Sequence, residues 1–444
     1  RGLGGLARTE VYRDYRFDIG GHRFFTPHEE IRRLWQSLLG DDLKTVSRVS
    51  RIHYRGRLFN YPLEPLNALV NLGPIESIRV LLSYVAAQLW PIRDATTLDR
   101  WVSNRFGRRL FEIFFSTYTE KVWGMPCHEI RAEWAAQRIQ GLSLRTAVMN
   151  ALFRTGTSKT LITTFHYPTL GPGMMWQQMA EEIRQGGGEV RLGREVSGLC
   201  RSGSRIASLV VRGEAGLEEI PVADVISSMP VGSLVRALDP AAPEAVLQAA
   251  AALRHRAFLV VGLVVNHRRF PPDNWIYIHS PEVRLGRLQL FRNWSEAMVP
   301  DPDRATLGAE YFCSVGDSLW SMTDPELIAL ASREIEQLGL VSARDVVDGV
   351  VFRQAHAYPV YDARYQESLA TVLGFLRGLE NLQTIGRNGL HCYNNMDDSM
   401  LAGLAAADRL IAARGGASLE LPRASDGASA RGGGSGIGSD RGQS

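Results

Sequence analysis

The chain has 444 residues, enough for roughly three domains with sizeable cores. Hydrophobic residues make up 45% and charged residues 22%, which excludes a disordered or fibrous protein. With 50 basic and 47 acidic residues the formal net charge is only +3, so no nucleic-acid partner is expected. Nearly all the basic residues are arginines. This excess mostly reflects base composition, but some guanidinium forks could bind phosphate.

The four cysteines lie far apart and form no cluster with histidines, so neither a disulfide framework nor a metal site is expected. They are Cys127, Cys200, Cys313 and Cys392. A reducing, cytoplasmic location is the expected one. No apolar run reaches the roughly 18 residues of a membrane span. The two most apolar stretches, residues 80–91 and 257–265, predict a core helix and a buried strand instead. The chain begins with Arg1 and shows no signal peptide.

In chain order, residues 9–19 predict extended structure, 28–39 a helix, and 46–58 two strands around a turn at Arg55-Gly56. The stretch from 74 to about 153 then has apolar residues at three- and four-residue spacing, which is typical of helices. The predicted helices cover 75–90, 98–106, 110–118 and 132–153. This block is interpreted as an inserted helical subdomain.

Beyond it, a helix over 174–185 ends at three glycines. Short strands are predicted over 189–192, 206–211 and 222–228, and a group over 258–265, 275–278, 288–291 and 307–312 predicts a second, antiparallel sheet. A helix over 324–339 is expected to have Asp324 as N-cap and Pro325 at its first position. A strand over 382–385, a loop rich in glycine and asparagine, and a helix from about 397 to 413 complete the fold. Residues from 414 onward predict a disordered tail.

Two glycine-rich segments could approach a ligand. The start, GLGGLA at residues 2–7, formally matches GxGxx(G/A), but no strand precedes it and no helix follows, so it is rejected as a dinucleotide fingerprint. Its glycines could still let backbone approach a flat or phosphorylated ligand, with a plain turn as the alternative. In GGHRFFT at residues 20–26, His22 could contact a planar cofactor, or the segment could be a tight turn with core aromatics.

The densest group of functional residue types lies in residues 385–400. A strand leads into a Gly/Asn loop and then a helix, whose N-terminus presents free N–H groups and the positive end of a dipole. Such an end can stabilise an anion, including the N1–C2 carbonyl edge of a reduced flavin. The alternative is an ordinary helix start capped by Asp397, Asp398 and Ser399.

Together these segments resemble the UDP-galactopyranose mutases and the wider group of FAD-dependent amine oxidases and protoporphyrinogen oxidases around them. The resemblance covers about residues 1–412. It is carried by GGHRFFT, TYTEKVWGMP (117–126), NWIYIH to LFRNWS (274–295), AYPVYD (357–362) and GRNGLHCYNNMDDSM (386–400). In that group a strand–GxGxxG–helix unit opens the chain, and the segment that follows this unit resembles residues 4–9. We therefore expect an N-terminally truncated FAD-binding domain.

The resemblance implies an α/β (α+β) fold. A discontinuous Rossmann-like FAD-binding domain takes 1–60, 160–240 and 375–413, the helical subdomain takes 61–159, and an antiparallel-sheet substrate domain takes 241–374. Residues 414–444 form the tail.

The same resemblance assigns site residues. FAD contacts fall on Gly4, Gly5, Arg8, Gly20, Gly21, His22, Gly386, Arg387, Asn395, Met396 and Ser399. Substrate contacts fall on Trp123, Arg138, Tyr277, Arg287, Tyr358, Tyr393 and Asn395, and the catalytic set is His22, Arg138 and Arg287. Trp123 could equally be a core residue. The two arginines would clamp a pyrophosphate, and the tyrosine hydroxyls would add donors.

The implied activity is ring contraction of a nucleotide sugar through N5 of the reduced flavin, in polysaccharide biosynthesis. An electron donor such as NAD(P)H would reduce the flavin, and the protein could be a homo-oligomer. Two alternatives stay open: a net redox FAD-dependent oxidoreductase, and a non-catalytic remnant. Pro27 and Thr119 depart from the mutase pattern, since many mutases carry a histidine and an asparagine at these positions.

Overall fold

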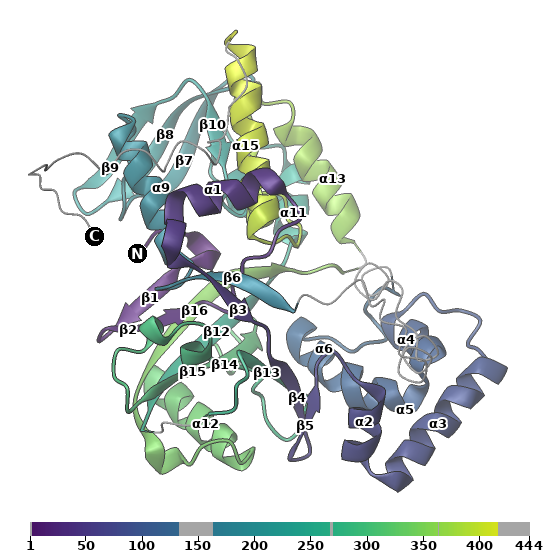
Figure 1. The fold of residues 1–444 in the computed structure, drawn as a ribbon. Coiled ribbons are helices and arrows are strands. Elements are labelled where there is room, and N and C mark those ends of the chain that lie inside the picture. Colours follow the sequence, from purple (N-terminus) through teal and green to yellow (C-terminus); the bar gives the residue numbers. More distant parts are fainter. Residues whose placement is uncertain (1, 133–162, 267–269, 363, 416–444) are drawn as a thin grey trace, which may run out of the picture.

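The computed structural model describes residues 2–132, 163–266, 270–362 and 364–415. Figure 1 shows three regions: a large sheet, a group of helices beside one end of it, and above both a mixed region that holds the first helix and the last. Helices and mixed sheets together confirm the expected fold class.

The large sheet has seven strands. Their order is β16 (Val346–Pro359), β12 (His255–Val265), β15 (Ala305–Cys313), β14 (Arg287–Leu290), β13 (Trp275–Ile278), β4 (Ser50–Tyr54) and β5 (Arg57–Asn60). The four strands predicted to form an antiparallel sheet, β12, β15, β14 and β13, do pair antiparallel, but β13 also pairs in parallel with β4, with Trp275 opposite Ser50. The sheet is therefore mixed, because the hairpin over 50–60 extends its edge.

The centre of this sheet is covered on both faces. Every residue of β15 and all of β12 except His255 are buried, as expected for strands packed on both sides. Helix α12 (Asp324–Gln337) packs on one face through Leu327, Ala331 and Ile335. The expected N-cap Asp324 is wrong: Thr323 is the N-cap, because its side chain and that of Glu326 form a reciprocal capping box.

The helical region comprises α2 (Pro65–Leu72), α3 (Pro74–Leu89), α4 (Leu98–Phe106), α5 (Arg108–Phe111), a π-helical turn (Glu112–Ser116) and α6 (Thr117–Trp123). Lys121 joins it to the sheet, since its ammonium donates to the carbonyls of Ile278, Ser280 and Leu285 at 3.3, 2.8 and 3.0 Å. The predicted helix over 132–153 lies outside the described residues, apart from its first residue. The prediction of a core helix at 80–91 is wrong, because α3 turns most of its large apolar side chains to the surface.

The third region holds α1 (Glu29–Leu39), α9 (Gly173–Gln185), α10 (Val231–Arg236), α11 (Glu244–Ala252), α13 (Tyr365–Leu376), α14 (Gly386–Gly389) and α15 (Met396–Ala413). Its four-stranded sheet has the order β11 (Leu238–Asp239), β7 (Glu195–Ser202), β8 (Arg205–Gly213) and β9 (Gly216–Pro221). Three two-stranded pairs complete it: β1 (Thr9–Tyr12) with β2 (Tyr15–Asp18), β3 (Leu43–Ser47) with β6 (Thr164–Pro168), and β10 (Val225–Ser227) with β17 (Leu382–Thr384).

Two predicted strands of this region need correction. Residues 189–192 form no strand, and the first strand after the glycines is β7, which starts at Glu195. The strand predicted over 222–228 is shortened to β10, because only three residues pair with β17, in parallel. All four cysteines are free thiols. Among the described residues, no helix combines the length and the hydropathy needed to cross a membrane.

A buried carboxyl group ties strands β1 and β2 to β6 and α9 within the third region. Tyr167 donates to Asp18 at 2.5 Å and Thr9 donates to it at 2.8 Å, while the backbone N–H of Gly173 donates to Thr9 at 3.0 Å. Burial raises the pKa of Asp18 to about 7, although the two hydroxyl donors act in the opposite direction. The folded state therefore takes up a proton here more readily than the unfolded chain.

Because the folded-state pKa of Asp18 is raised, its contribution to stability is present at low pH and is lost as pH rises from about 4 to about 7. The Asp18→Asn variant stays neutral throughout. We expect the difference in free energy of unfolding to move in favour of the variant between pH 5 and pH 8. Denaturation of both proteins in the same cofactor state measures it, and a shift in favour of the wild type would contradict the raised pKa.

Candidate functional site

A cavity of about 910 Å³ opens where the three regions meet. Its walls come from parts of the chain that are far apart in sequence, among them residues 4–7 and 19–25, the helical region, strands β12, β13, β14 and β16 of the large sheet, and residues 386–400. No single segment forms the site, so its chemistry depends on how the three regions pack.

The glycines of the loop at 20–22 are required by close approach. Gly20 has φ +105°, and a Cβ on Gly21 would lie 2.9 Å from the side-chain nitrogen of Gln289. His22 follows and lines the cavity. Both aromatics after it line the cavity, and Phe24 also stacks in the core on Trp35 with ring centroids 4.0 Å apart. The segment is thus a core turn on one side and a cavity wall on the other.

The His22 imidazole is neutral near physiological pH. Its pKa is lowered to about 3, mainly by desolvation and also by the cationic side chains of Arg387 and Arg287. Its Nδ1 atom is buried without a hydrogen-bond partner. A buried, unsatisfied nitrogen is costly unless a ligand completes its hydrogen bonding.

A charged cluster supports the wall formed by the large sheet. Arg287 donates through Nε to the carboxylate of Glu310, and Gln289 donates to the other carboxylate oxygen at 2.7 Å. Glu310 is completely buried. Burial by itself would lower the pKa of Arg287, but the Glu310 carboxylate raises it well above its usual value. Arg287 therefore presents a fixed positive charge to the cavity, while Gln289 Oε1 is left without a partner.

Aromatic rings make up much of the remaining wall. The rings of Tyr358 and Tyr393 stack with centroids 6.0 Å apart, and the Arg387 guanidinium lies over both at 5.5 and 4.7 Å. Tyr118 stacks on His279 at 5.0 Å and meets Tyr277 edge-on at 5.4 Å. Cation–π contacts of this kind hold the rings in place, so the phenol groups are pre-positioned.

The N-terminus of α15 reaches the cavity through Met396, Asp397 and Ser399. Asn395 is the N-cap and forms a capping box with Asp398, which accepts the Asn395 N–H at 2.9 Å. The alternative of capping by Asp397, Asp398 and Ser399 therefore holds only for Asp398. Ser399 instead donates to Asn394 at 3.1 Å. The free N–H groups and dipole of this end favour an anion in the cavity.

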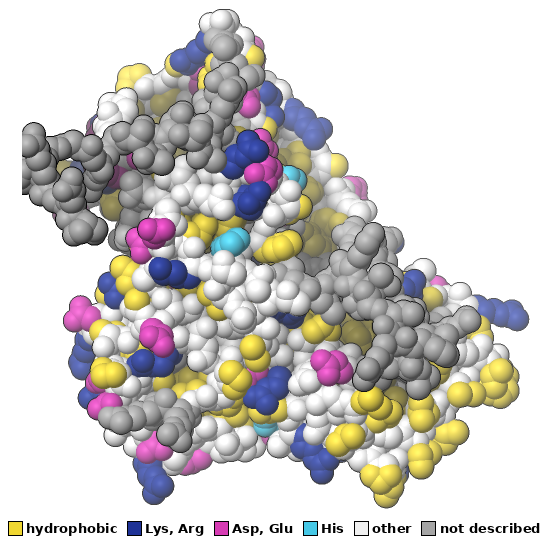
Figure 2. All heavy atoms as spheres, viewed as in Figure 1, with side chains coloured by type: hydrophobic (Ala, Val, Ile, Leu, Met, Phe, Trp, Pro, Cys, Tyr) yellow, Lys and Arg dark blue, Asp and Glu magenta, His cyan; other side chains and the backbone are white. Residues whose placement is uncertain are grey.

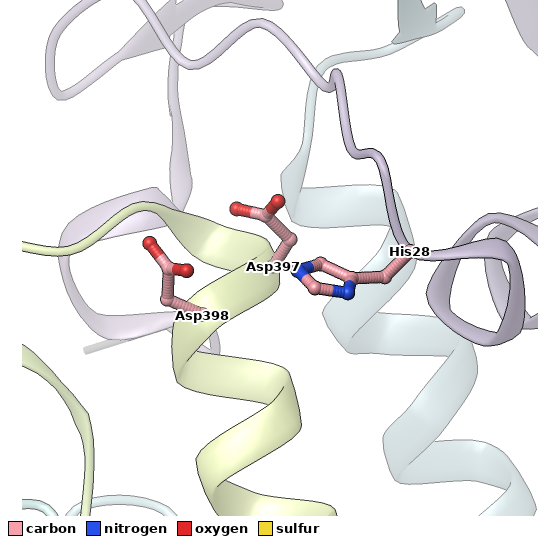
Figure 3. Close-up of side chains that lie close together, drawn as sticks. All are labelled: His28, Asp397 and Asp398. Atoms are coloured by element: carbon pink, nitrogen blue, oxygen red, sulfur yellow. The ribbon is translucent and has the colours of Figure 1, made fainter.

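His28, Asp397 and Asp398 come together at the same helix end (Figure 3), with potential ligand atoms within 4.8 Å of one another. Two facts argue against a cation there. Asp398 is already engaged in the capping box, and the positive end of the helix dipole opposes a second positive charge. We attribute both carboxylates to the helix start.

Most residues predicted for the site do line the cavity. They are Gly4, Gly5, Gly20, Gly21, His22, Tyr277, Arg287, Tyr358, Gly386, Arg387, Tyr393, Asn395, Met396 and Ser399. Their individual roles stay predictions.

Two predicted residues that the structure describes do not line the cavity. Trp123 lies in the hydrophobic core of the helical region, and the Arg8 guanidinium donates hydrogen bonds to Glu10 and Gln354. Arg138 lies outside the described residues.

Tyr118, Gln289 and Glu310 were missed. Gln289 lies two residues from Arg287 on β14, hence on the same face, and Glu310 is the cross-strand partner of Arg287. A glutamate inside the apolar run of 305–313 was the available signal.

Glycine loops, a helix N-terminus and fixed guanidinium groups around a large aromatic-walled cavity define a site for a dinucleotide-type cofactor together with a polar substrate. Residues 1–411 match the family model of the flavin-containing amine oxidoreductases. The chain belongs to this family, and its cofactor is FAD.

Solved structures share the fold at low sequence identity. A reduced UDP-galactopyranose mutase matches with 19% identity, a TM-score of 0.79, and coverage of 93% of this chain and 88% of the other. A candidate protoporphyrinogen oxidase from Exiguobacterium sp. matches with 15% identity, a TM-score of 0.66, and coverage of 92% and 91%. A putrescine oxidase variant matches with 15% identity, a TM-score of 0.59, and coverage of 93% and 92%.

The residues present fit FAD. His22 Nδ1 and Gln289 Oε1 are buried polar atoms that lack partners, and the glycines at 20–21 leave backbone open to a flat ring. The positive end of the α15 dipole and the charge of the Arg387 guanidinium both face the cavity, and an anionic cofactor needs such positive potential. When bound, the flavin supplies electron-pair and hydride chemistry that side chains cannot perform.

Replacing Glu310 with glutamine leaves Arg287 without its counter-charge in a nearly closed site. We expect Glu310→Gln to lower the free energy of unfolding by about 3 kcal/mol, because removing one partner leaves an uncompensated charge. Denaturant unfolding of the FAD-loaded protein measures this. The matched control is Glu282→Gln at an exposed position, and an equal effect of the two changes would argue against the cluster.

His22→Ala should change the absorption spectrum and the affinity of the bound flavin while lowering the melting temperature only slightly, since the ring lines the cavity. Spectra and thermal melts of wild type and variant test this. His128→Ala, at an exposed position, should alter neither. Loss of stability with an unchanged flavin spectrum would assign His22 to the core.

Proposed function

We propose that this protein is an FAD-dependent enzyme that acts on a nucleotide sugar, as a UDP-galactopyranose mutase-like catalyst of ring contraction. The observation that carries the proposal is the position of Arg287. Its charge faces a cavity also lined by Tyr277, Tyr358 and Tyr393, and Glu310 holds it from behind. A planar cation ringed by phenols suits a pyrophosphate with a sugar attached.

The protonation states agree with this role. Burial raises the pKa of Tyr118 well above its usual value and also raises that of Tyr358, although Arg287 acts to lower both. These phenols are therefore protonated donors at neutral pH. His22 is neutral and adds no charge beside the cofactor. The protein's contribution is then to bind the diphosphate, orient the sugar and supply neutral donors around it.

A redox-neutral reaction fits this wall better than the net oxidation of an apolar amine, which needs no fixed arginine. The shared fold with a UDP-galactopyranose mutase is compatible with the proposal, but at 19% identity it concerns the fold alone. By the resemblance of its sequence, Arg138 would provide the second half of the diphosphate clamp.

The competing function is a net redox oxidoreductase, which the family itself favours. One side of the cavity supports it. Leu98, Phe114 and Phe115 from the helical region form an apolar wall that would accept a hydrophobic substrate. The two functions differ in whether each turnover consumes an electron acceptor or donor.

Arg287→Ala should weaken binding of UDP by about a hundredfold, since hydrogen bonds to charged groups contribute about 1.5–3 kcal/mol. Arg287→Lys should restore only part of the affinity, because an ammonium lacks the fork. Titration with UDP, followed by tryptophan fluorescence, measures it. Arg284→Ala, three residues away and exposed, is the control. Wild-type affinity in Arg287→Ala would remove the nucleotide-sugar proposal.

With UDP-galactopyranose as the probe, we expect turnover only after the flavin has been reduced. NAD(P)H should be used to activate the enzyme and not once per product, because ring contraction leaves the flavin in its starting state. Product analysis alongside nicotinamide and oxygen consumption decides this. One equivalent of acceptor or donor per product would favour the oxidoreductase.

A further inference from the structure

An apolar surface covers the outer side of α2, α3 and the residues just after them. Ten large hydrophobic side chains there are 44–76% exposed: Leu66, Val70, Ile75, Ile78, Leu81, Leu82, Val85, Leu89, Trp90 and Ile92. Figure 2 shows hydrophobic side chains gathered over these two helices. We call these ten residues the α2–α3 surface. Contiguous exposed apolar patches of this kind mark interaction sites.

In helix α3 most of the large apolar side chains lie on the exposed face of the helix. Ile75, Ile78, Leu82, Val85 and Leu89 recur at spacings of three and four, so they share one face, and all are exposed. The inward face places Val80 in the hydrophobic core and otherwise carries residues such as Ser77, Ser83 and Glu76, which form hydrogen bonds or ion pairs.

These inward contacts hold the helix in place. Ser77 donates to the carbonyl of Leu69 at 3.0 Å, Ser83 accepts the backbone N–H of Arg109 at 3.0 Å, and Glu76 pairs with Arg109 at 2.5 Å. A Cβ on Gly107 would lie 2.7 Å from the backbone nitrogen of Tyr84, so α3 is tightly seated. The packing of α3 therefore keeps its apolar residues on the outer side of the helix.

The same part of the chain carries its positive charge. Residues 55–109 hold eight arginines and four acidic residues, a net charge of +4, whereas the whole chain has +3. The remainder therefore carries −1. Two of the four acidic groups are paired, Glu76 with Arg109 and Asp94 with Arg100. Figure 2 shows basic side chains at the borders of the apolar area.

We propose that the α2–α3 surface docks the protein on an anionic lipid surface. An apolar face bordered by arginines is what an interfacial helix presents to lipid, and Trp90 at the end of α3 has the amphipathic ring found at that depth. A second copy of the chain would bring the two basic borders together, which opposes a symmetric pair. Helix α3 has only 16 residues, so it lies on the membrane and does not cross it.

The test uses the full FAD-loaded chain and its flotation with vesicles of phosphatidylcholine, with and without phosphatidylglycerol. Wild type should float with the anionic vesicles. The double variant Leu82→Ser, Leu89→Ser should bind at least about tenfold more weakly, because it removes two side chains that would enter the lipid. The matched control is Leu217→Ser with Val315→Ser, which changes two equally exposed apolar residues elsewhere and should bind as wild type does.

A second set of variants tests whether binding to the vesicles depends on the positive charge beside the α2–α3 surface. Arg79→Gln with Arg93→Gln should weaken binding to the anionic vesicles by about tenfold, and the wild type should bind more weakly in high salt. Arg184→Gln with Arg212→Gln is the control pair outside this region.

Two results would overturn the proposal. A wild-type dimer that the leucine variant splits, without vesicle binding, would assign the surface to a second copy. A wild-type monomer that binds no vesicles would show that lipid is not its partner. Because flotation needs no substrate, either result leaves the proposed reaction untouched.

Discussion

The site depends on one buried carboxylate. Glu310 lies in the most deeply buried strand of the large sheet, where a charge is tolerated only with donors on both oxygens. Arg287 and Gln289 provide them, and this fixes both side chains on the neighbouring strand. The arginine keeps its charge and has one orientation, so this wall of the cavity is set before any ligand binds.

The cofactor side of the cavity follows the opposite principle. His22 is kept neutral by burial and by two nearby guanidinium groups, and the start of α15 offers N–H groups and no cationic side chain. Positive potential therefore comes from backbone dipoles and from Arg387, which tyrosine rings hold in place. Such a site can stabilise negative charge on a bound ring without gaining or losing protons itself.

Local patterns predicted α1, α3, α4, α9, α12 and α15, because three- and four-residue spacing reflects one face of a helix, but they missed α2, α10, α11 and α13. They failed for the burial of α3, which was predicted from its apolar composition alone. In α3 most of the large apolar side chains point outward, because Ser77 and Ser83 hold the inward face through hydrogen bonds to Leu69 and Arg109 and the backbone at Tyr84 packs closely against Gly107. The mixed sheet was missed for a similar reason: the parallel pairing of β4 with β13 joins segments more than 200 residues apart.

By itself the sequence determined the fold class, the family and several segments that line the cavity, because glycines, the His22 loop and the 386–400 stretch are local chemical signals. Only the tertiary structure decided which side chains share the cavity. Trp123 packs in the core, whereas Tyr118, which belongs to the same motif, lines the cavity. The reason is that one face of the helix packs inward and the other faces the sheet. Glu310 was found only through its cross-strand pairing with Arg287, a contact that strand register creates and sequence spacing does not reveal.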